Sequence, residues 1–204
     1  MAFTYFFRDV HTLNLVVQHL LPQVAGRSRV KVWDAGCAMG QEPYSLAILL
    51  AEGMGKFAFR NVHIDATDLD GSCLFGDIIA GGEYPAEELQ RIPEDKLQRH
   101  FAPSGRSGYL RLNEEIRSRV TFRRHDLLTL QPPGAEYSLV ICKNVLLHFS
   151  AQERVSVLQM FHRSLVPGGL LALEQTQKLP QAVAELFVAV TAEAQVFQKR
   201  GEPG

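Results

Sequence analysis

The stretch Val32-Trp33-Asp34-Ala35-Gly36-Cys37-Ala38-Met39-Gly40 decides how this chain folds. The residues from Val30 to Trp33 form an apolar run that predicts a short strand leading into the glycine turn. A helix is expected from about Glu42 to Glu52, with Pro43 in its first turn, where a missing N–H costs nothing. The two glycines allow positive φ and close approach of the backbone to a ligand, beside the free N–H groups of the helix. The stretch therefore predicts either a ligand-binding turn or an ordinary strand–turn–helix junction.

The spacing of this turn differs from that of dinucleotide-binding enzymes. Their G-x-G-x-x-G pattern requires a third glycine, which is absent here, and Asp34 precedes the turn at the end of the strand. A carboxylate at that position would repel a pyrophosphate group. It suits a ligand that carries a positively charged amino group, as S-adenosylmethionine does.

Two further acidic residues follow predicted strands. Asp68 comes just after the strand from Val62 to Ala66, and Asp126 follows the strand from Arg119 to Arg124. Asp68 could accept two hydrogen bonds from a ribose diol, or it could cap the helix after it. Asp126 could accept the adenine amino group, with Leu127 packing against the ring. Ligands of open α/β sheets bind outside the carboxyl ends of the strands, so these positions predict an adenosyl pocket.

The length, charge and cysteine content of the chain indicate a globular protein of one domain. The 204 residues are 46% hydrophobic with a net charge of −1, which suits one domain over residues 1–204 and calls for neither nucleic acid nor a membrane surface as partner. The three cysteines show no metal-ligand spacing, so no metal is expected. No signal peptide and no apolar run of roughly 20 residues is found, which predicts a cytoplasmic protein without membrane insertion.

The order of elements predicts a Rossmann-like, three-layer α/β fold, with a mostly parallel seven-stranded sheet, helices on both faces and a small β insertion. An amphipathic helix at 9–21 is expected to close at Pro22 and Gly26. The other expected elements are a helical region at 71–101 broken near Gly81-Gly82 and Pro93, the β insertion at 101–122, strands at 137–142 and 170–174, a helix at 151–165, and a closing hairpin at 185–191 and 194–199.

Five segments, in the right order from Phe3 to about Leu173, resemble motifs of the CheR-type chemotaxis receptor methyltransferases. These are Phe3-Thr4-Tyr5-Phe6-Phe7-Arg8, the segment Asp34 to Ser45, Ala66-Thr67-Asp68-Leu69-Asp70, Cys142-Lys143-Asn144-Val145, and Leu165 to Gly169.

The resemblance implies an S-adenosylmethionine-dependent enzyme that esterifies glutamate side chains of a protein and leaves S-adenosylhomocysteine. It implies that Arg8 lies near the transferred methyl group and orients the substrate carboxylate. A glutamate side chain has a pKa near 4.3, so it is already ionised and needs no general base. By position in the motifs, the residues expected to touch the cofactor or line its pocket, besides Asp34, Gly36 and Gly40 of the turn, are Thr4, Arg8, Glu42, Asp68, Asp126, Leu127, Lys143 and Asn144.

Two departures from the family pattern leave other functions open. The family has a helical domain ahead of the position of Thr4, and this chain starts almost at the motif, so we expect that domain to be missing. His148 stands where the family places an active-site tyrosine. It could act as a general base for a hydroxyl or amine acceptor, replace the tyrosine as a hydrogen-bonding group, or have no role. The alternatives are a small-molecule methyltransferase that uses His148, and a non-catalytic signalling module that binds the cofactor.

A basic segment is the candidate surface for a protein partner. Between Arg99 and Arg124 the chain carries seven arginines against Glu114 and Glu115. Such a patch could meet an acidic receptor helix, or it could be a solvated face.

Overall fold

The computed structural model describes residues 4–201, so Phe3, where the family resemblance begins, lies outside the described residues. Seven strands form the main sheet in the order β6-β2-β1-β7-β8-β10-β9. The first five of these are parallel to one another, and β10 is antiparallel to both β8 and β9. The predicted mostly parallel sheet is thus confirmed. Its strands are β1 (Val30–Ala35), β2 (Val62–Asp68), β6 (Val120–Arg124), β7 (Tyr137–Cys142), β8 (Leu165–Leu173), β9 (Phe187–Ala189) and β10 (Val196–Lys199).

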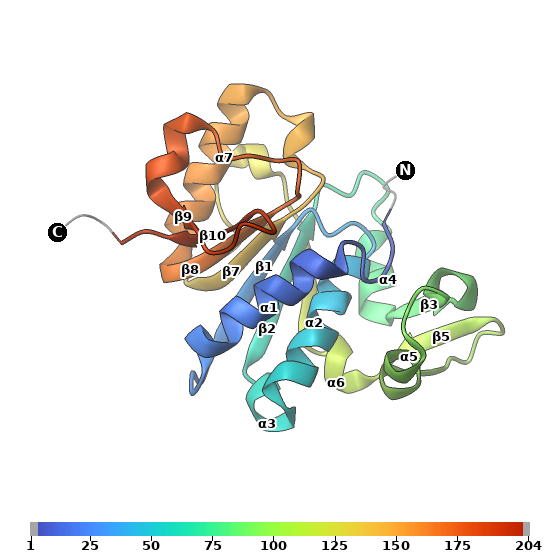
Figure 1. Cartoon of the computed structure of the whole chain (residues 1–204). Coiled ribbons are helices and arrows are strands. Elements are labelled where there is room, and N and C mark those ends of the chain that lie inside the picture. The colour runs from blue at the N-terminus through green and yellow to red at the C-terminus, as the bar shows by residue number, and fades with distance from the viewer. Residues whose placement is uncertain (1–3, 202–204) are drawn as a thin grey trace.

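Helices cover both faces of the main sheet. The helices α1 (Val10–Val24) and α2 (Gln41–Met54) pack on one face, as Figure 1 shows, and α7 (Ala151–Ser164) packs on the other. Successive strand residues point to opposite faces. Accordingly, Val32 of β1 belongs to the apolar cluster under α1 and α2, and Trp33 belongs to the cluster under α7.

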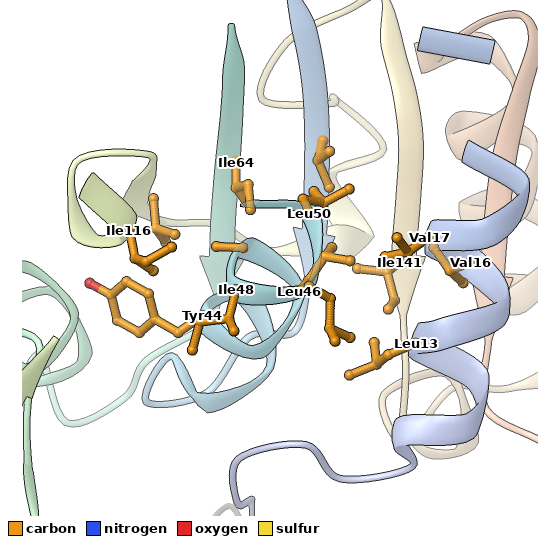
Figure 2. Close-up of a cluster of buried hydrophobic side chains, with 14 of the residues drawn as sticks. Leu13, Val16, Val17, Tyr44, Leu46, Ile48, Leu50, Ile64, Ile116 and Ile141 are labelled. Atoms are coloured by element: carbon orange, nitrogen blue, oxygen red, sulfur yellow. The ribbon is translucent and has the colours of Figure 1, made fainter. Parts of the chain in front are cut away.

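The cluster under α1 and α2 is drawn in Figure 2. Leu13 and Val16 of α1 point towards Ile141 of β7, and Leu46 and Leu50 of α2 lie between α1 and the strands. All five side chains are fully buried. Complete burial of a side chain of this size contributes about 1.5–3 kcal/mol, so this stripe holds both helices against the sheet.

The helix predicted for residues 9–21 extends further than expected. Pro22 lies inside α1, which continues to Val24. The prediction that Pro22 closes this helix is therefore wrong. A proline removes one backbone hydrogen bond, but here it stands in the last turn, and the buried Leu20 and Val24 keep that turn on the core.

The β insertion starts earlier in the chain than predicted. A separate sheet in the order β3-β5-β4 is formed by β3 (Glu83–Pro85), β4 (Phe101–Pro103) and β5 (Tyr109–Leu112), and it lies to one side of the main sheet in Figure 1. The helical pieces predicted within 71–101 are α4 (Phe75–Gly81) and α5 (Glu94–His100). The strand β3 was not predicted, because three residues that follow two glycines and end in a proline carry little local signal. They pair instead with the distant residues 109–111.

The remaining helices are short. They are α3 (Lys56–Phe59) and α6 (Glu114–Arg117), and the 3-10 turns η1 (Ala86–Leu89), η2 (Leu127–Thr129), η3 (Leu146–His148) and η4 (Gln181–Leu186). The helix α7 begins with a capping box, in which the Ser150 hydroxyl accepts from the Glu153 N–H and the Glu153 carboxylate accepts from the Ser150 N–H. This cap sets where the loop after β7 ends.

The last part of the chain follows the prediction except at the start of one strand. The strand β8 begins at Leu165 rather than Leu170, so Pro167-Gly168-Gly169 lies inside it and shifts its register against β7. The closing hairpin is confirmed by the antiparallel pair β9 and β10. Within residues 4–201, no helix has both the length and the apolar character needed to cross a membrane.

Candidate functional site

A cavity of about 600 Å³ opens at the carboxyl ends of β1, β2, β6 and β7. Its walls are the segments that follow these strands, together with the N-terminal segment ahead of α1. In the sheet, β2 lies on one side of β1 and β7 lies on the other, so the chain order reverses here. Ligands of open α/β sheets bind at such a reversal. The residues that line the cavity are Thr4, Arg8, Gly36, Cys37, Ala38, Glu42, Thr67, Asp68, Leu69, His125, Asp126, Leu127, Lys143, Asn144, Val145, Leu147, His148 and Phe149.

The glycine turn brings bare backbone to the cavity wall. Gly36 has φ +106°, and a Cβ added to it would lie 2.1 Å from Cγ2 of Val145. A side chain is therefore excluded both by conformation and by space. The Gly36 N–H donates to the Thr67 carbonyl at 2.7 Å, which ties the turn to the end of β2.

Asp68 holds the same turn with its side chain. Its Oδ2 accepts a hydrogen bond from the Ala38 N–H at 2.9 Å, and its Oδ1 accepts from the Asp70 N–H at 3.3 Å. Each carboxylate oxygen has a second lone pair, and Asp68 lines the cavity, so it retains the capacity to accept from a diol. The helix that follows, α4, begins at Phe75, whose N–H donates to Asp70, so Asp68 does not cap it.

Lys143 joins three parts of the chain at the cavity wall. Its side chain is 1% exposed, and its Nζ lies 3.1 Å from Oε2 of Glu42 and 3.4 Å from Oδ2 of Asp9. The same ammonium donates to the Arg8 carbonyl at 3.4 Å. Burial raises the pKa of Glu42, and the charge of Lys143 opposes that rise. The end of β7, the start of α2 and the N-terminal segment are thus held by one buried cation.

Asp34 lies behind the wall rather than in it. Its side chain is fully buried, and neither carboxylate oxygen has a hydrogen-bond partner among the described residues. Burial raises the pKa of Asp34, the negative charges of Glu42 and Asp68 raise it further, and Lys143 lowers it. An unpaired buried carboxylate is costly, so a positively charged ligand group near the turn would relieve it. The acidic groups in and behind the wall therefore fit a cationic ligand such as S-adenosylmethionine.

The two residues predicted to be catalytic both line the cavity. The Arg8 Nη2 donates to Oδ1 of Asn144 at 3.1 Å, and Asn144 holds a positive φ of 60° just after β7. His148 is exposed and ends the 3-10 turn η3. Arg8, from the segment ahead of α1, and His148, from the loop between β7 and α7, thus line the same cavity.

Most of the predicted site residues come together at this cavity. Those that line it are Thr4, Arg8, Gly36, Glu42, Asp68, Asp126, Leu127, Lys143, Asn144 and His148. Asp34 and Gly40 are the exceptions. Gly40 has φ +95°, and a Cβ there would lie 2.7 Å from Cγ1 of Ile79, so it shapes the turn from outside the cavity.

Sequence reasoning missed the remaining wall residues. They are Cys37, Ala38, Thr67, Leu69, His125, Val145, Leu147 and Phe149. All are close neighbours of predicted residues in the same loops, and most are apolar. Their place in those loops was the signal that could have found them.

The predicted basic segment is partly neutralised within the protein. Arg117 pairs with Glu114, and Arg123 pairs with the buried Asp65 at 2.9 Å. Arg119 donates to the Arg60 carbonyl at 2.8 Å, and Arg124 donates to the Leu69 carbonyl at 2.9 Å. These four arginines therefore have structural partners.

The chain has a Rossmann-like α/β fold that is shared by solved methyltransferases. The rRNA methyltransferase aviRa of Streptomyces viridochromogenes superposes with a TM-score of 0.60 at 15% identity, over 97% of this chain and 86% of that one. The magnesium protoporphyrin IX methyltransferase ChlM of Synechocystis PCC 6803, solved with bound SAM, gives 0.51 at 17% identity over 95% and 80%. At these identities the likeness shows the fold alone.

The chain belongs to the CheR methyltransferase SAM-binding domain family, whose sequence model matches residues 2–196. The resemblance seen in the motifs is confirmed, and S-adenosylmethionine is the cofactor of this domain. Chemotaxis protein methyltransferase 1 of Pseudomonas aeruginosa is 36% identical over 184 residues, which cover 86% of this chain and 66% of that protein. The chemotaxis protein methyltransferase of Listeria innocua is 32% identical over 85% of this chain and 64% of its own length. This chain therefore spans about two thirds of the length of these relatives.

Proposed function

We propose that this chain is a methyltransferase domain, formed by residues 1–204 as one unit, that transfers the methyl group of S-adenosylmethionine to glutamate carboxylates of chemotaxis receptor proteins in the cytoplasm. The observation that carries the proposal is the cavity at the carboxyl ends of β1, β2, β6 and β7, which has Asp68, Asp126 and Arg8 in its wall. The names of the relatives from Pseudomonas and Listeria support the choice of receptor proteins as substrates.

Different cavity residues would bind different parts of the cofactor. Asp68 would accept the ribose hydroxyls with the lone pairs that face the cavity. Asp126 would accept the adenine amino group, since its Oδ1 already accepts from the Leu128 N–H and orients the carboxylate. Leu127, which is 6% exposed, offers an apolar surface to the ring. Asp34, Glu42 and Lys143 would determine the local electrostatic potential near the amino group of the ligand.

Arg8 would orient the acceptor. S-adenosylmethionine supplies an electrophilic methyl group on a sulfonium. A glutamate acceptor is ionised at neutral pH and attacks without a base, so the domain needs to provide alignment and exclusion of water, which are worth up to about 7–11 kcal/mol in favourable cases. The guanidinium of Arg8 can hold a carboxylate through two hydrogen bonds. Its bond to Asn144 fixes the guanidinium at the cavity.

Calorimetry with S-adenosylhomocysteine tests the binding site. We expect the wild-type chain to bind, and Asp68→Asn to weaken binding by roughly tenfold or more, because hydrogen bonds to a charged group are worth about 1.5–3 kcal/mol. The matched control is Asp95→Asn, which changes an exposed aspartate on α5 away from the cavity. Failure of the folded wild-type chain to bind would defeat the proposal.

Methyl transfer is tested with labelled S-adenosylmethionine and a receptor preparation. A base-labile ester on the receptor is the expected product, and Arg8→Ala should lower the rate of transfer far more than it lowers S-adenosylhomocysteine affinity. Label on a small molecule, with a rate that depends on an ionisation near pH 6–7, would favour the small-molecule enzyme in which His148 is the base. Binding of the cofactor with no transfer to any acceptor would favour a signalling module.

A further inference from the structure

We infer that Tyr84, on the small sheet, is a positioning residue that sets the shape of the glycine turn and of the N-terminal segment at the cofactor cavity. The expected effect of Tyr84 on cofactor affinity rests on the proposed function. Tyr84 lies outside the cavity wall and would act on the cofactor through the residues that it holds. The physical contacts that support it hold for the protein without ligand.

The hydroxyl of Tyr84 is bonded to the glycine turn. It donates to the Met39 carbonyl at 2.8 Å, and a Cβ added to Gly40 would lie 2.9 Å from the same hydroxyl oxygen. Tyr84 is 2% exposed, so this bond is shielded from water. Losing a shielded bond would leave the Met39 carbonyl to find another partner.

The other hydrogen bonds of the turn run to β2, within the turn itself and to α2, where the Tyr44 N–H donates to the Gly40 carbonyl at 3.1 Å. Gly36 and Cys37 donate to the Thr67 carbonyl, Ala38 donates to Asp68, and Gly40 donates to the Cys37 carbonyl at 3.1 Å. These bonds fix the first half of the turn against the main sheet. Tyr84 approaches the second half from the opposite side, from the small sheet, where it pairs with Leu110 of β5.

The ring of Tyr84 also fixes the N-terminal segment. Phe6 packs edge-on against Tyr84 with ring centroids 4.9 Å apart, and against Phe101 of β4 at 5.6 Å. Phe6 is 1% exposed. Two cavity residues, Thr4 and Arg8, stand two positions before and after it. The position of Phe6 against the rings of Tyr84 and Phe101 therefore determines where both residues reach the cavity.

One side chain thus connects the small sheet to two walls of the cofactor cavity. Its hydroxyl holds the turn that carries Gly36 and Ala38, and its ring holds the segment that carries Thr4 and Arg8. A change in the small sheet must move Tyr84 and hence both walls, because the aromatic rings are close-packed.

The test compares Tyr84→Phe with Tyr44→Phe. Both variants keep the ring and lose one hydroxyl bond to a backbone carbonyl, but the Tyr44 hydroxyl donates to Ile79 rather than to the turn. The two rings are 6.3 Å apart, and their burial is matched because Tyr44 is 0% and Tyr84 is 2% exposed. Amide hydrogen exchange of Ala38 and Gly40 is measured on the ligand-free proteins, and S-adenosylhomocysteine affinity is measured by calorimetry.

Tyr84→Phe should speed exchange at Ala38 and Gly40 by roughly three- to tenfold and weaken S-adenosylhomocysteine affinity by a similar factor, the usual value of one hydrogen bond. Tyr44→Phe should leave both within about twofold of wild type. Phe6→Leu, which keeps the Tyr84 hydroxyl, should speed exchange at Phe7 and Arg8 more than at Ala38.

Equal exchange in Tyr84→Phe and wild type would overturn the inference, as would an equal effect of Tyr44→Phe. If the wild-type chain fails to bind S-adenosylhomocysteine, the proposed function fails, and faster exchange at Ala38 and Gly40 in Tyr84→Phe alone would still support the positioning of the turn by Tyr84. If the wild type binds and exchange is unchanged, the proposed binding site stands and the inference on Tyr84 fails.

Discussion

Two buried aspartates on neighbouring strands differ in the face of the sheet that they point to, in their hydrogen-bond partners and in the direction of their pKa shifts. Asp65 of β2 is the register partner of Trp33 in β1, so it faces the α7 side of the sheet, and Asp34, the next residue along β1, faces the other side. Asp65 accepts from Arg123 at 2.9 Å, from Tyr137 at 2.8 Å and lies 3.3 Å from His63. Asp34 has no hydrogen-bond partner among the described residues.

The pKa values of the two groups shift in opposite directions. Burial acts to raise the pKa of Asp65, but the hydrogen bonds from His63 and Tyr137 and the charge of Arg123 lower it below its usual value. Burial and nearby negative charge raise the pKa of Asp34. The comparison separates a buried carboxylate with several partners, which we expect to stabilise the fold, from one without hydrogen-bond partners, which we propose contributes to ligand binding.

The largest expected effect is the loss of the Asp65 carboxylate. Asp65→Ala leaves the buried Tyr137 hydroxyl and the half-exposed Arg123 guanidinium without their acceptor. The free energy of unfolding in urea should fall by roughly 2–3 kcal/mol. Glu185→Gln, at an exposed position, is the control and should change it by less than about 0.5 kcal/mol. A fall no larger than that of the control would show that Asp65 is not a structural carboxylate.

The pH dependence of the unfolding free energy tests the contribution of the Asp65 carboxylate in a second way. Because the pKa of Asp65 is lowered in the folded chain, its contribution is present above the ordinary value of 3.8 and is lost as pH falls through the folded pKa. The difference in unfolding free energy between wild type and Asp65→Asn should therefore narrow below pH 3.8. A difference that stays constant from pH 6 to acid would contradict this.

Asp34→Asn should affect binding rather than stability. The raised pKa means that the folded chain loses stability as pH rises from 3.8 through the folded pKa, so removing the carboxyl should leave stability at pH 7 equal or higher. Under the proposed function, affinity for S-adenosylhomocysteine should weaken by roughly tenfold, because the acidic group behind the glycine turn is replaced by a neutral amide. Calorimetry and urea unfolding measure the two quantities. A loss of stability as large as in Asp65→Ala would remove the distinction.

A smaller effect is expected for Tyr137→Phe. The variant loses one of the three interactions of Asp65 and keeps the ring beside Trp33, whose centroid is 5.7 Å away. The cost should be about 1 kcal/mol, measured as a shift of the urea midpoint with an unchanged slope. An unchanged midpoint would mean that water replaces the hydroxyl at Asp65.

The smallest effect is expected for His63→Gln. The His63 side chain is 37% exposed, and pairs near the surface contribute about 0.2–1 kcal/mol. Thermal unfolding at pH 7 should show a small decrease that is less than that of Tyr137→Phe. A larger decrease would show that His63, rather than Tyr137, is the main partner of Asp65.

The fold could be predicted from the sequence wherever the signal was local. The helical stripe that includes Leu13 and Val16, the apolar strands and the glycine turn all follow from residues near one another in the chain. Expectations were wrong where distant contacts decided the outcome. The strand β3 exists because of its pairing with β5, and α1 continues past Pro22 because Val24 is buried against the core.

The candidate site shows the same division. Asp68 and Asp126 could be placed near a ligand because each follows a strand of a parallel sheet, and both line the cavity. The sequence could not reveal that Lys143 joins Glu42 to Asp9, because these residues are separated by more than 100 positions from Lys143. Nor could it reveal the bond from Tyr84 to the turn.

By itself, the sequence determined the order and type of most elements, the glycine turn, the family and the cofactor, because these depend on periodicity and short motifs. Only the tertiary structure decided which acidic groups face the cavity, which are paired and which are buried alone. The reason is physical: the pKa and the hydrogen bonding of a side chain depend on groups that the fold brings to within a few ångströms. Asp34 and Asp65, on neighbouring strands, have the same chemical group, and their pKa values shift in opposite directions for this reason.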